Sequence, residues 1–407
     1  MYKVISITIL ILFFSWKSKK NENLLIKQTT EVNQNSKNFK FVIAESGLNY
    51  RSEPKGKILG KFEWREKVEY LYDTSITQKI IDNYTEVEGT WVAVKNKKDT
   101  VFVFDYYLSD DEPSFSKTKL YYAEPYFNEI RKPSNERDIR QAFINVSESF
   151  YMPENFLEKK DLRKDTIYFN KEQRKEFFKR MKYSITDSIF IYDFKSGIIK
   201  KHLVDKTPII ACISIYAKTD EEYKTQDYDE WSYQIGFNLG KMTSAGFAMI
   251  AKENPFVENG LQQIIFEEMD SASIEINIEN SLVPEGWKNN TVPAYTFSYE
   301  NTGFFVKKSK DSYGWNNLIV KNVNTKESFD VDINEGESSS LAPIKIKGEK
   351  GDHDNYFQYQ GTQYIGKLFK DKSPVVFGFT YKSFGCPSIE FIDKQELPIL
   401  ILCDNRH

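Results

Sequence analysis

The sequence predicts a mainly β protein, α+β overall, in which a small β-barrel precedes a larger β-rich region with a few helices. Aromatic residues make up 15% of the 407 residues. Tyr and Phe favour strands because flat rings pack well on a pleated surface. Short apolar segments recur along the chain between turn residues, which is typical of sheets. Only two segments have the spacing of an amphipathic helix.

Length and charge limit the classes of function. At roughly 100–200 residues per domain, a chain of 407 residues predicts two or three domains. A hydrophobic fraction of 40% and a charged fraction of 28% are typical of a globular protein. The net charge of −3 argues against a nucleic-acid partner, because such partners require a basic surface that displaces counterions.

Residues 1–15 resemble a secretory signal peptide. A short cationic start, Met1–Lys3, is followed by an apolar run, Val4–Phe14, and then by polar residues. With a helical rise of about 1.5 Å per residue, this run reaches roughly 17 Å, well short of a hydrocarbon core of about 30 Å. We therefore expect no transmembrane span. The alternative is a buried N-terminal strand of a cytosolic protein.

The residue at position 16 bears on membrane anchoring. The segment Leu12–Lys17 resembles a bacterial lipoprotein leader, in which a cysteine follows the small residue, but Trp16 stands there in this chain. Without a thiol there is nothing to acylate, so lipid anchoring is not expected. The polar residues 16–39 are typical of a flexible tether. We expect an exported protein of the periplasm or cell envelope.

Residues 40–109 carry a series of short strand patterns. Leu48 and Tyr50 alternate with polar residues, which is the period of a half-buried strand. Pro54 and Gly56 favour a turn. Further apolar strand patterns occupy residues 41–44, 58–62, 68–72, 91–94 and 101–104. Because closing a small sheet removes its exposed edges, this spacing predicts a compact β-barrel.

The segment Gly47–Pro54, which reads Gly-Leu-Asn-Tyr-Arg-Ser-Glu-Pro, resembles the Gly-Leu-Asn-x-Arg-Ser-x-Pro mark of bacterial SH3-type (SH3b) domains. The resemblance implies an SH3-like β-barrel that binds cell-wall peptide or an envelope protein. The chain departs from the family in a long loop from Asp73 to Gly89, and loops shape the ligand surface. Later marks of the family follow in order at Gly60, Glu66–Val68, Trp91–Val92 and Tyr107–Leu108.

The candidate ligand residues of this module are aromatic rings with nearby polar groups. Rings give contact area at little entropic cost, and amide or guanidinium groups fix orientation. The alternative is structural: Trp91 lies in an apolar strand and suits a core, whereas Asn49 and Arg51 suit fastening of a turn. The candidates are Asn49, Arg51, Trp64, Trp91 and Tyr106.

A larger region follows the barrel. Residues 110–118 are acidic and rich in turn formers, so we interpret them as a linker. Residues 119–407 are dominated by strand patterns that favour a sheet or sandwich architecture. We place a division of this region near residues 280–290.

Two helices are predicted in the larger region. The first covers Arg137–Phe150 and begins at Ser134 or Asn135 as its N-cap. The second runs from Lys171 to about Tyr183. Its N-cap is Asn170, and Gln173 stands three residues later, as a capping box requires. The side chains Phe177, Phe178 and Met181 form an apolar stripe that faces a core.

Three cysteines leave at least one thiol unpaired. Cys386 and Cys403 both stand in strand-like contexts, and we expect a disulfide between them. The chain-entropy model credits such a bond with about 3 kcal/mol. Two buried thiols are the alternative. Cys212 lies in an apolar strand, with no helix N-terminus to lower its pKa, and suits a buried, inert thiol.

The sequence contains no recognised catalytic motif. Its three histidines, His202, His353 and His407, are too far apart for a His-Glu-x-x-His zinc site. A Gly-x-Ser-x-Gly elbow and a phosphate-binding loop are both missing. The Asp352–Asp354 segment, which includes His353, suits a solvated loop. We therefore predict no catalytic residues, no metal and no cofactor.

These observations favour an exported envelope protein that binds cell-wall peptide or a protein partner without catalysis. The first alternative is a cell-wall hydrolase targeted by the same module. Glycoside hydrolysis needs only two carboxylates about 5–10 Å apart, and the 59 acidic residues do not single out a pair. The second alternative is a partner-inhibiting, immunity-type protein, which would present a large exposed aromatic patch.

Overall fold

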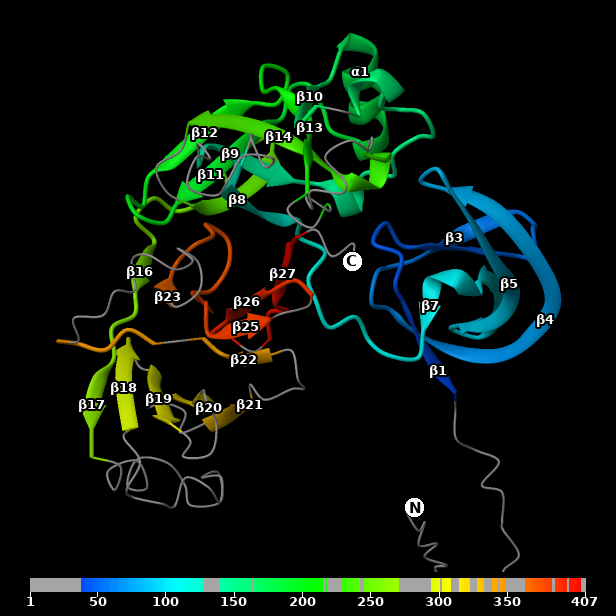
Figure 1. Cartoon of the computed structure of the whole chain (residues 1–407). Helices are drawn as coiled ribbons and strands as arrows, with labels where there is room; N and C mark the ends of the chain where they lie inside the picture. The colour runs from blue at the N-terminus through cyan, green and yellow to red at the C-terminus, as the bar shows by residue number, and fades with distance from the viewer. Residues whose placement is uncertain are drawn as a thin grey trace, which may run out of the picture.

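The computed structural model confirms the mainly β fold class. The described residues form three sheets and one α-helix, and nearly every strand pair is antiparallel (Figure 1). The exception is the parallel pair formed by β8 and β27. The structure describes residues 38–127, 139–162, 164–214, 217, 228–241, 245–270, 294–300, 302–308, 315–322, 328–332, 339–342, 344–348, 363–382, 385–393 and 395–403.

The first sheet has seven strands in the order β3-β2-β6-β5-β4-β1-β7 and curls round on itself (Figure 1). Its inner face buries a cluster of apolar residues, among them Val42, Leu48, Phe62 and Val94. A short 3-10 helix, η1 (Asp105–Tyr107), precedes the last strand. The strands are β1 (Phe39–Val42), β2 (Leu48–Arg51), β3 (Ile58–Phe62), β4 (Lys67–Asp82), β5 (Thr85–Asn96), β6 (Asp99–Phe104) and β7 (Leu108–Ser109).

The segment predicted as a long loop, Asp73–Gly89, is a hairpin arm instead. β4 and β5 stay paired to their ends, where Asp82 faces Thr85. The two residues between them, Asn83 and Tyr84, have φ angles of 46° and 70°. Positive φ at both central positions gives the turn whose twist matches paired strands. The arm helps to bury a second cluster, here called the arm cluster, which consists of Val87, Trp91 and Phe104.

The second sheet contains thirteen strands. Its main path runs β10-β13-β14-β9-β8-β27-β26-β24-β23-β16, with β15, β11 and β12 joined in turn beyond β8. The strands are β8 (Leu120–Phe127), β9 (Ile139–Asn145), β10 (Thr166–Tyr168), β11 (Ser188–Asp193), β12 (Ile199–Leu203), β13 (Ile209–Ile213), β14 (Tyr233–Lys241), β15 (Gly246–Ala251), β16 (Leu261–Gln263), β23 (Tyr364–Gly366), β24 (Val375–Phe377), β26 (Ser388–Phe391) and β27 (Ile399–Leu402).

Strand β11 is covered on both faces, which explains its continuous apolar sequence. Ile189 and Ile191 belong to one core cluster, and Phe190 and Tyr192 belong to another. Successive side chains of a strand point to opposite faces, so the two clusters lie on opposite sides of this part of the sheet. A strand buried on both faces loses the alternation of apolar and polar residues.

Helix α1 (Lys171–Met181) confirms the second predicted helix. The Asn170 side chain accepts a hydrogen bond from the Gln173 amide, and the Gln173 side chain accepts one from the Asn170 amide. The helix is followed by Lys182 as its C-cap, whose φ of 57° lies in the left-handed region. Phe177 and Met181 are buried against the sheet, whereas Phe178 is only half-buried. Short 3-10 helices occupy Ser147–Ser149, Lys159–Asp161 and Glu230–Ser232.

The first predicted helix is wrong where the structure describes it. Its residues form β9, which pairs with β8 and β14 and is followed by a 3-10 turn. Ala142, Phe143 and Ile144 are all buried. Three successive apolar residues suit either a helix or a strand covered on both faces, so their spacing does not distinguish the two. Ser134, Asn135 and Arg137 lie outside the described residues.

Most of the third sheet is built from the chain between β16 and β23 of the second sheet, and its last strand, β25, comes from the chain between β24 and β26. β16 and β23 pair with each other, and the third sheet begins after β16. The division predicted near residues 280–290 lies outside the described residues. The strands are β17 (Glu267–Met269), β18 (Ala294–Tyr299), β19 (Thr302–Lys308), β20 (Trp315–Asn322), β21 (Ser328–Asp332), β22 (Ser339–Leu341) and β25 (Thr380–Lys382).

The first sheet contacts the rest of the chain at the tip of the hairpin arm. The Arg180 guanidinium of α1 lies 4.0 Å from the centre of the Tyr84 ring, a cation–π contact. The linker, residues 110–118, contacts the first sheet through an ion pair of 2.8 Å between Lys40 and Asp110. The Ser116 amide donates to the Pro398 carbonyl oxygen of the larger region. The linker is therefore in contact with both parts.

Candidate functional site

Trp91 and Arg51, two of the five candidate ligand residues, contact each other within the barrel. Trp91 lies in β5 and the arm cluster and is 6% exposed. Its indole nitrogen donates a hydrogen bond of 2.9 Å to Gln78. The Arg51 guanidinium lies 5.6 Å from the centre of the Trp91 ring and donates to the Gly56 carbonyl oxygen. These contacts correspond to the structural alternative, in which Trp91 packs in a core and Arg51 fastens a turn.

Trp64 lies where the barrel meets the linker. The Arg65 guanidinium and the Lys117 ammonium each lie 5.7 Å from its ring centre. Arg65 also pairs with Glu112 of the linker at 2.5 Å. The ring is half-buried, and two cations of the same chain already contact it. This arrangement fastens the linker to the barrel more than it offers a free aromatic platform.

Asn49 and Tyr106 remain exposed, on separate elements. Asn49 lies in β2 and faces Lys61 of β3 across the strand pair. Tyr106 lies in η1 and is 48% exposed, with its ring edge-on to Tyr107 at 5.2 Å. The five predicted candidates therefore lie on different elements: the first sheet, η1 and the turn between β3 and β4. Arg51 and Trp91 are the pair that the described structure brings into contact.

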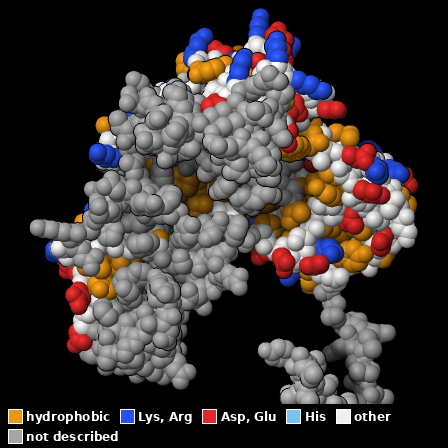
Figure 2. Space-filling model, in the orientation of Figure 1, with side chains coloured by type: hydrophobic (Ala, Val, Ile, Leu, Met, Phe, Trp, Pro, Cys, Tyr) orange, Lys and Arg blue, Asp and Glu red, His pale blue; other side chains and the backbone are white. Residues whose placement is uncertain are grey.

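An apolar strand edge lies beside Asn49, and sequence reasoning missed it. Within the described sheet, β3 pairs only with β2. Ile58 is 46% exposed and Leu59 is 53% exposed. Arg51 pairs with Ile58 and Tyr50 pairs with Gly60, so Leu59 is the extra residue of a bulge. The sequence signal for this edge is that Ile58 and Leu59 are adjacent apolar residues, which breaks the alternation of apolar and polar residues in β3. Figure 2 shows hydrophobic side chains in several groups on the barrel surface.

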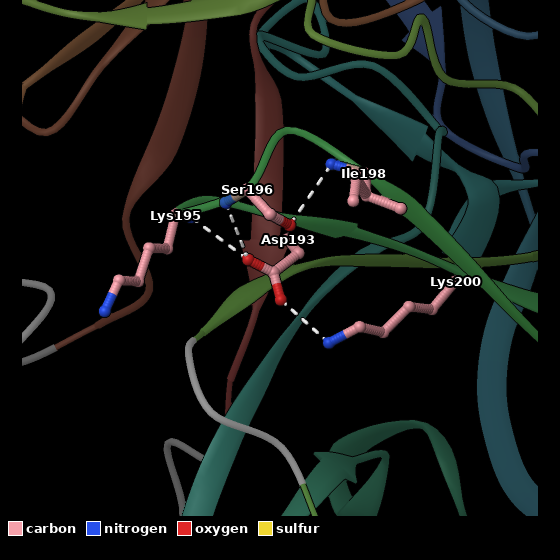
Figure 3. Close-up of polar contacts among 5 residues, drawn as sticks. All are labelled: Asp193, Lys195, Ser196, Ile198 and Lys200. Carbon is pink, nitrogen blue, oxygen red and sulfur yellow. Dashed lines mark hydrogen bonds and ion pairs between the residues drawn. The ribbon is translucent and has the colours of Figure 1, made fainter.

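The larger region contains a buried carboxylate held by its own turn (Figure 3). Asp193 closes β11, and its side chain is 3% exposed. It accepts hydrogen bonds of 3.1 Å from the backbone amides of Lys195 and Ser196 and an ion pair of 2.8 Å from Lys200. Gly197 supplies the positive φ, 67°, that this turn needs. The cluster shapes the β11–β12 hairpin, and its partners are donors of the protein itself.

A cavity of about 380 Å³ opens at one end of the second sheet. It is lined by side chains from β10, β12 and β14, among them Tyr168, His202 and Asn238. His202 is the one histidine within the described ranges, and it is half-buried. Burial lowers the pKa of the His202 imidazole, and the nearby Lys200 ammonium lowers it further.

The lowered pKa of His202 predicts a pH dependence of stability. The unfolded chain holds the imidazole proton at the ordinary pKa of about 6.5, whereas the folded chain gives it up more readily. Below pH ~6.5 the unfolded state binds more protons, so His202 lowers stability as the pH falls. We expect the difference in urea midpoint between pH 7.5 and pH 5.5 to be smaller in His202→Gln than in the unmodified chain. Equal differences would contradict this assignment.

Cys386 and Cys403 form a disulfide, with Cα atoms 5.5 Å apart. The bond joins β27 to the turn before β26, beside the parallel pair with β8. Cys212 takes no part in a disulfide and is buried in β13, between β10 and β14. His353 and His407, like Asp352 and Asp354, lie outside the described residues.

The described residues show neither a metal-binding group nor a membrane-spanning helix. They contain no group of three or more His, Cys, Asp or Glu side chains placed to hold a metal ion. In the same ranges, no helix has the length and apolar character needed to cross a bilayer. The predicted leader and nearly all of the tether lie outside those ranges, in residues 1–37.

Comparisons with known proteins do not assign this chain to a family. No family model matches it, and searches of curated proteins and of solved structures found no similar protein. The resemblance of Gly47–Pro54 to SH3b domains therefore rests on the sequence marks themselves.

Proposed function

We propose that this chain is an exported bacterial envelope protein that works by binding, and that its SH3b-like barrel docks it onto cell-wall peptide or an envelope protein. The observation that carries the proposal is the apolar edge of β3 beside Asn49. That edge lies within the first sheet next to β2, the strand formed by the central residues of the Gly47–Pro54 segment. The residues that resemble SH3b domains therefore lie next to the exposed apolar edge of β3.

The exposure of Ile58 and Leu59 supports a binding role, because an open apolar strand edge is a liability that folded proteins usually cover. A partner strand could add to β3 by backbone hydrogen bonds, with its apolar side chains covering this pair. Asn49 offers an amide next to that edge, which can donate and accept hydrogen bonds. An extended peptide is thus the class of ligand that suits this surface.

Replacing Ile58 by lysine tests the proposal. A charge at the centre of an apolar contact is expected to lower retention of the full chain on purified cell-wall sacculi or envelope fractions about tenfold, a loss of about 1.4 kcal/mol. Retention is measured by co-sedimentation over a range of protein concentrations. Far-UV circular dichroism of the variant shows whether the fold is intact.

The matched control is Ile81→Lys, which makes the same change on β4 at a residue that is 70% exposed. It should leave retention unchanged. Equal loss in both variants, or no retention of the unmodified chain, contradicts docking through β3. Release of soluble wall fragments by the unmodified chain would instead support the hydrolase alternative.

A further inference from the structure

The cavity between β10, β12 and β14 has the features of a small binding site. Its volume of about 380 Å³ falls within the roughly 300–1,000 Å³ of ligand pockets. The residues that give it chemical character are Tyr168, His202, Lys206 and Asn238, with Leu203 as an apolar wall. All of them belong to the larger region, so the site is separate from the barrel edge.

Tyr168 supplies an aromatic surface at the mouth of the cavity. It is the last residue of β10, a short edge strand that pairs with β13. Its side chain is 58% exposed although it lines the cavity, and Leu203 is 49% exposed. A flat ring and an aliphatic side chain at one opening form an apolar surface that a ligand ring can cover.

His202 supplies hydrogen-bonding capacity that the described residues leave unused. None of the described residues hydrogen-bonds to its imidazole, although the side chain is half-buried. Its lowered pKa keeps the ring neutral near pH 7. A neutral imidazole offers one N–H donor and one nitrogen acceptor. A ligand that can both accept and donate at neighbouring atoms, such as one with hydroxyl groups, satisfies both.

The floor of the cavity is shaped by a break in β14. The register of β14 against β9 shifts between Asn238 and Gly240. Asn238 is 6% exposed, and its side-chain oxygen accepts a hydrogen bond of 2.9 Å from the Gly240 amide. Gly240 has a φ of 72°, and no described atom lies within 4 Å of the place where a Cβ would stand. The backbone therefore leaves open space here.

The charge at the rim is balanced. Lys206 is exposed and pairs with the neighbouring Asp205 at 3.1 Å. An anionic ligand would have to compete with this pair, whereas an uncharged ligand would not. From the apolar rim, the half-buried imidazole and the paired charge of Lys206, we infer that this cavity binds one pyranose ring of a neutral sugar, with its C–H face on Tyr168 and its hydroxyl groups on His202.

Calorimetric titration of the full chain with N-acetylglucosamine and with glucose tests the inference. Sorbitol is the matched ligand control, because it carries hydroxyl groups but has no ring face. We expect at least one of the two sugars to bind and sorbitol to bind at least tenfold more weakly. The inference is overturned if sorbitol binds as tightly as the sugar. It is also overturned if neither sugar binds at concentrations up to about 50 mM.

Two substitutions locate the binding. Tyr168→Ala should weaken sugar affinity about tenfold and His202→Ala about fivefold, because a stacking surface and a hydrogen-bonding group are lost. Tyr151→Ala is the control, since Tyr151 is 52% exposed and lies outside the lining of the cavity. Unchanged affinity in Tyr168→Ala contradicts the site. Sugar binding and retention through β3 are separate measurements, so either proposal can fail alone.

Discussion

Replacing Phe177 by alanine is expected to lower the free energy of unfolding around α1 by about 3–5 kcal/mol, the largest effect of any change proposed for this chain. The Phe177 side chain is fully buried at the centre of an aromatic cluster. Its ring centre lies 5.0 Å from that of Phe150, 6.0 Å from that of Phe169 and 5.6 Å from that of Phe237. Truncation removes these contacts and leaves a cavity. The three neighbouring rings belong to different segments of the chain, so they cannot all move in to fill it.

Hydrogen exchange of the α1 amides measures this loss locally, which suits a chain of more than one sheet. The control is Phe178→Ala, one residue along the helix, where the ring is half-buried and lies 5.3 Å from the Arg174 guanidinium. It should cost about 1 kcal/mol, as most partly exposed substitutions do. If the two variants exchanged alike, Phe177 would not be the centre of this core.

Local chemistry near α1 could be predicted from the sequence, because every interaction that defines its start lies within four residues. Asn170 and Gln173 form the expected capping box, and Phe177 and Met181 are buried as the helical period requires. The neighbouring failure, over β9, has the opposite cause. Its apolar residues are buried by pairing with β8 and β14, and β14 lies about ninety residues further along the chain. Such a long-range partner leaves no local pattern to detect.

The candidate site on the barrel shows the same limit. The sequence indicated that Trp91 suited a core, and the structure adds the hairpin arm that covers it. The arm itself was missed because its turn, Asn83-Tyr84, lacks the glycine that usually marks such a turn. The cavity was beyond prediction for another reason. Tyr168, His202 and Asn238 stand far apart in the sequence, and β12 pairs only with β11 among the described strands, so the curvature of the whole sheet brings them together.

Replacing Asp193 by alanine is expected to destabilise the β11–β12 hairpin by about 3 kcal/mol. The loss has two parts (Figure 3). The backbone amides of Lys195 and Ser196 lose the buried carboxylate that accepts their part-buried hydrogen bonds, and leaving such donors without an acceptor costs about 1–3 kcal/mol. Lys200 loses its partner but is 37% exposed, so its ammonium can turn to water and adds little.

The matched control for this change is Asp229→Ala. Asp229 caps the 3-10 helix Glu230–Ser232 and accepts hydrogen bonds from the Ser232 amide and hydroxyl, but at the surface. Water can replace an exposed acceptor, so this variant should cost about 1 kcal/mol or less. Hydrogen exchange of the residue 188–203 amides measures the loss in Asp193→Ala, and exchange of the residue 229–233 amides measures it in Asp229→Ala. Equal destabilisation by Lys200→Met and Asp193→Ala would contradict this prediction. It would mean that the ion pair, and not the hydrogen bonds of the turn, stabilises the hairpin.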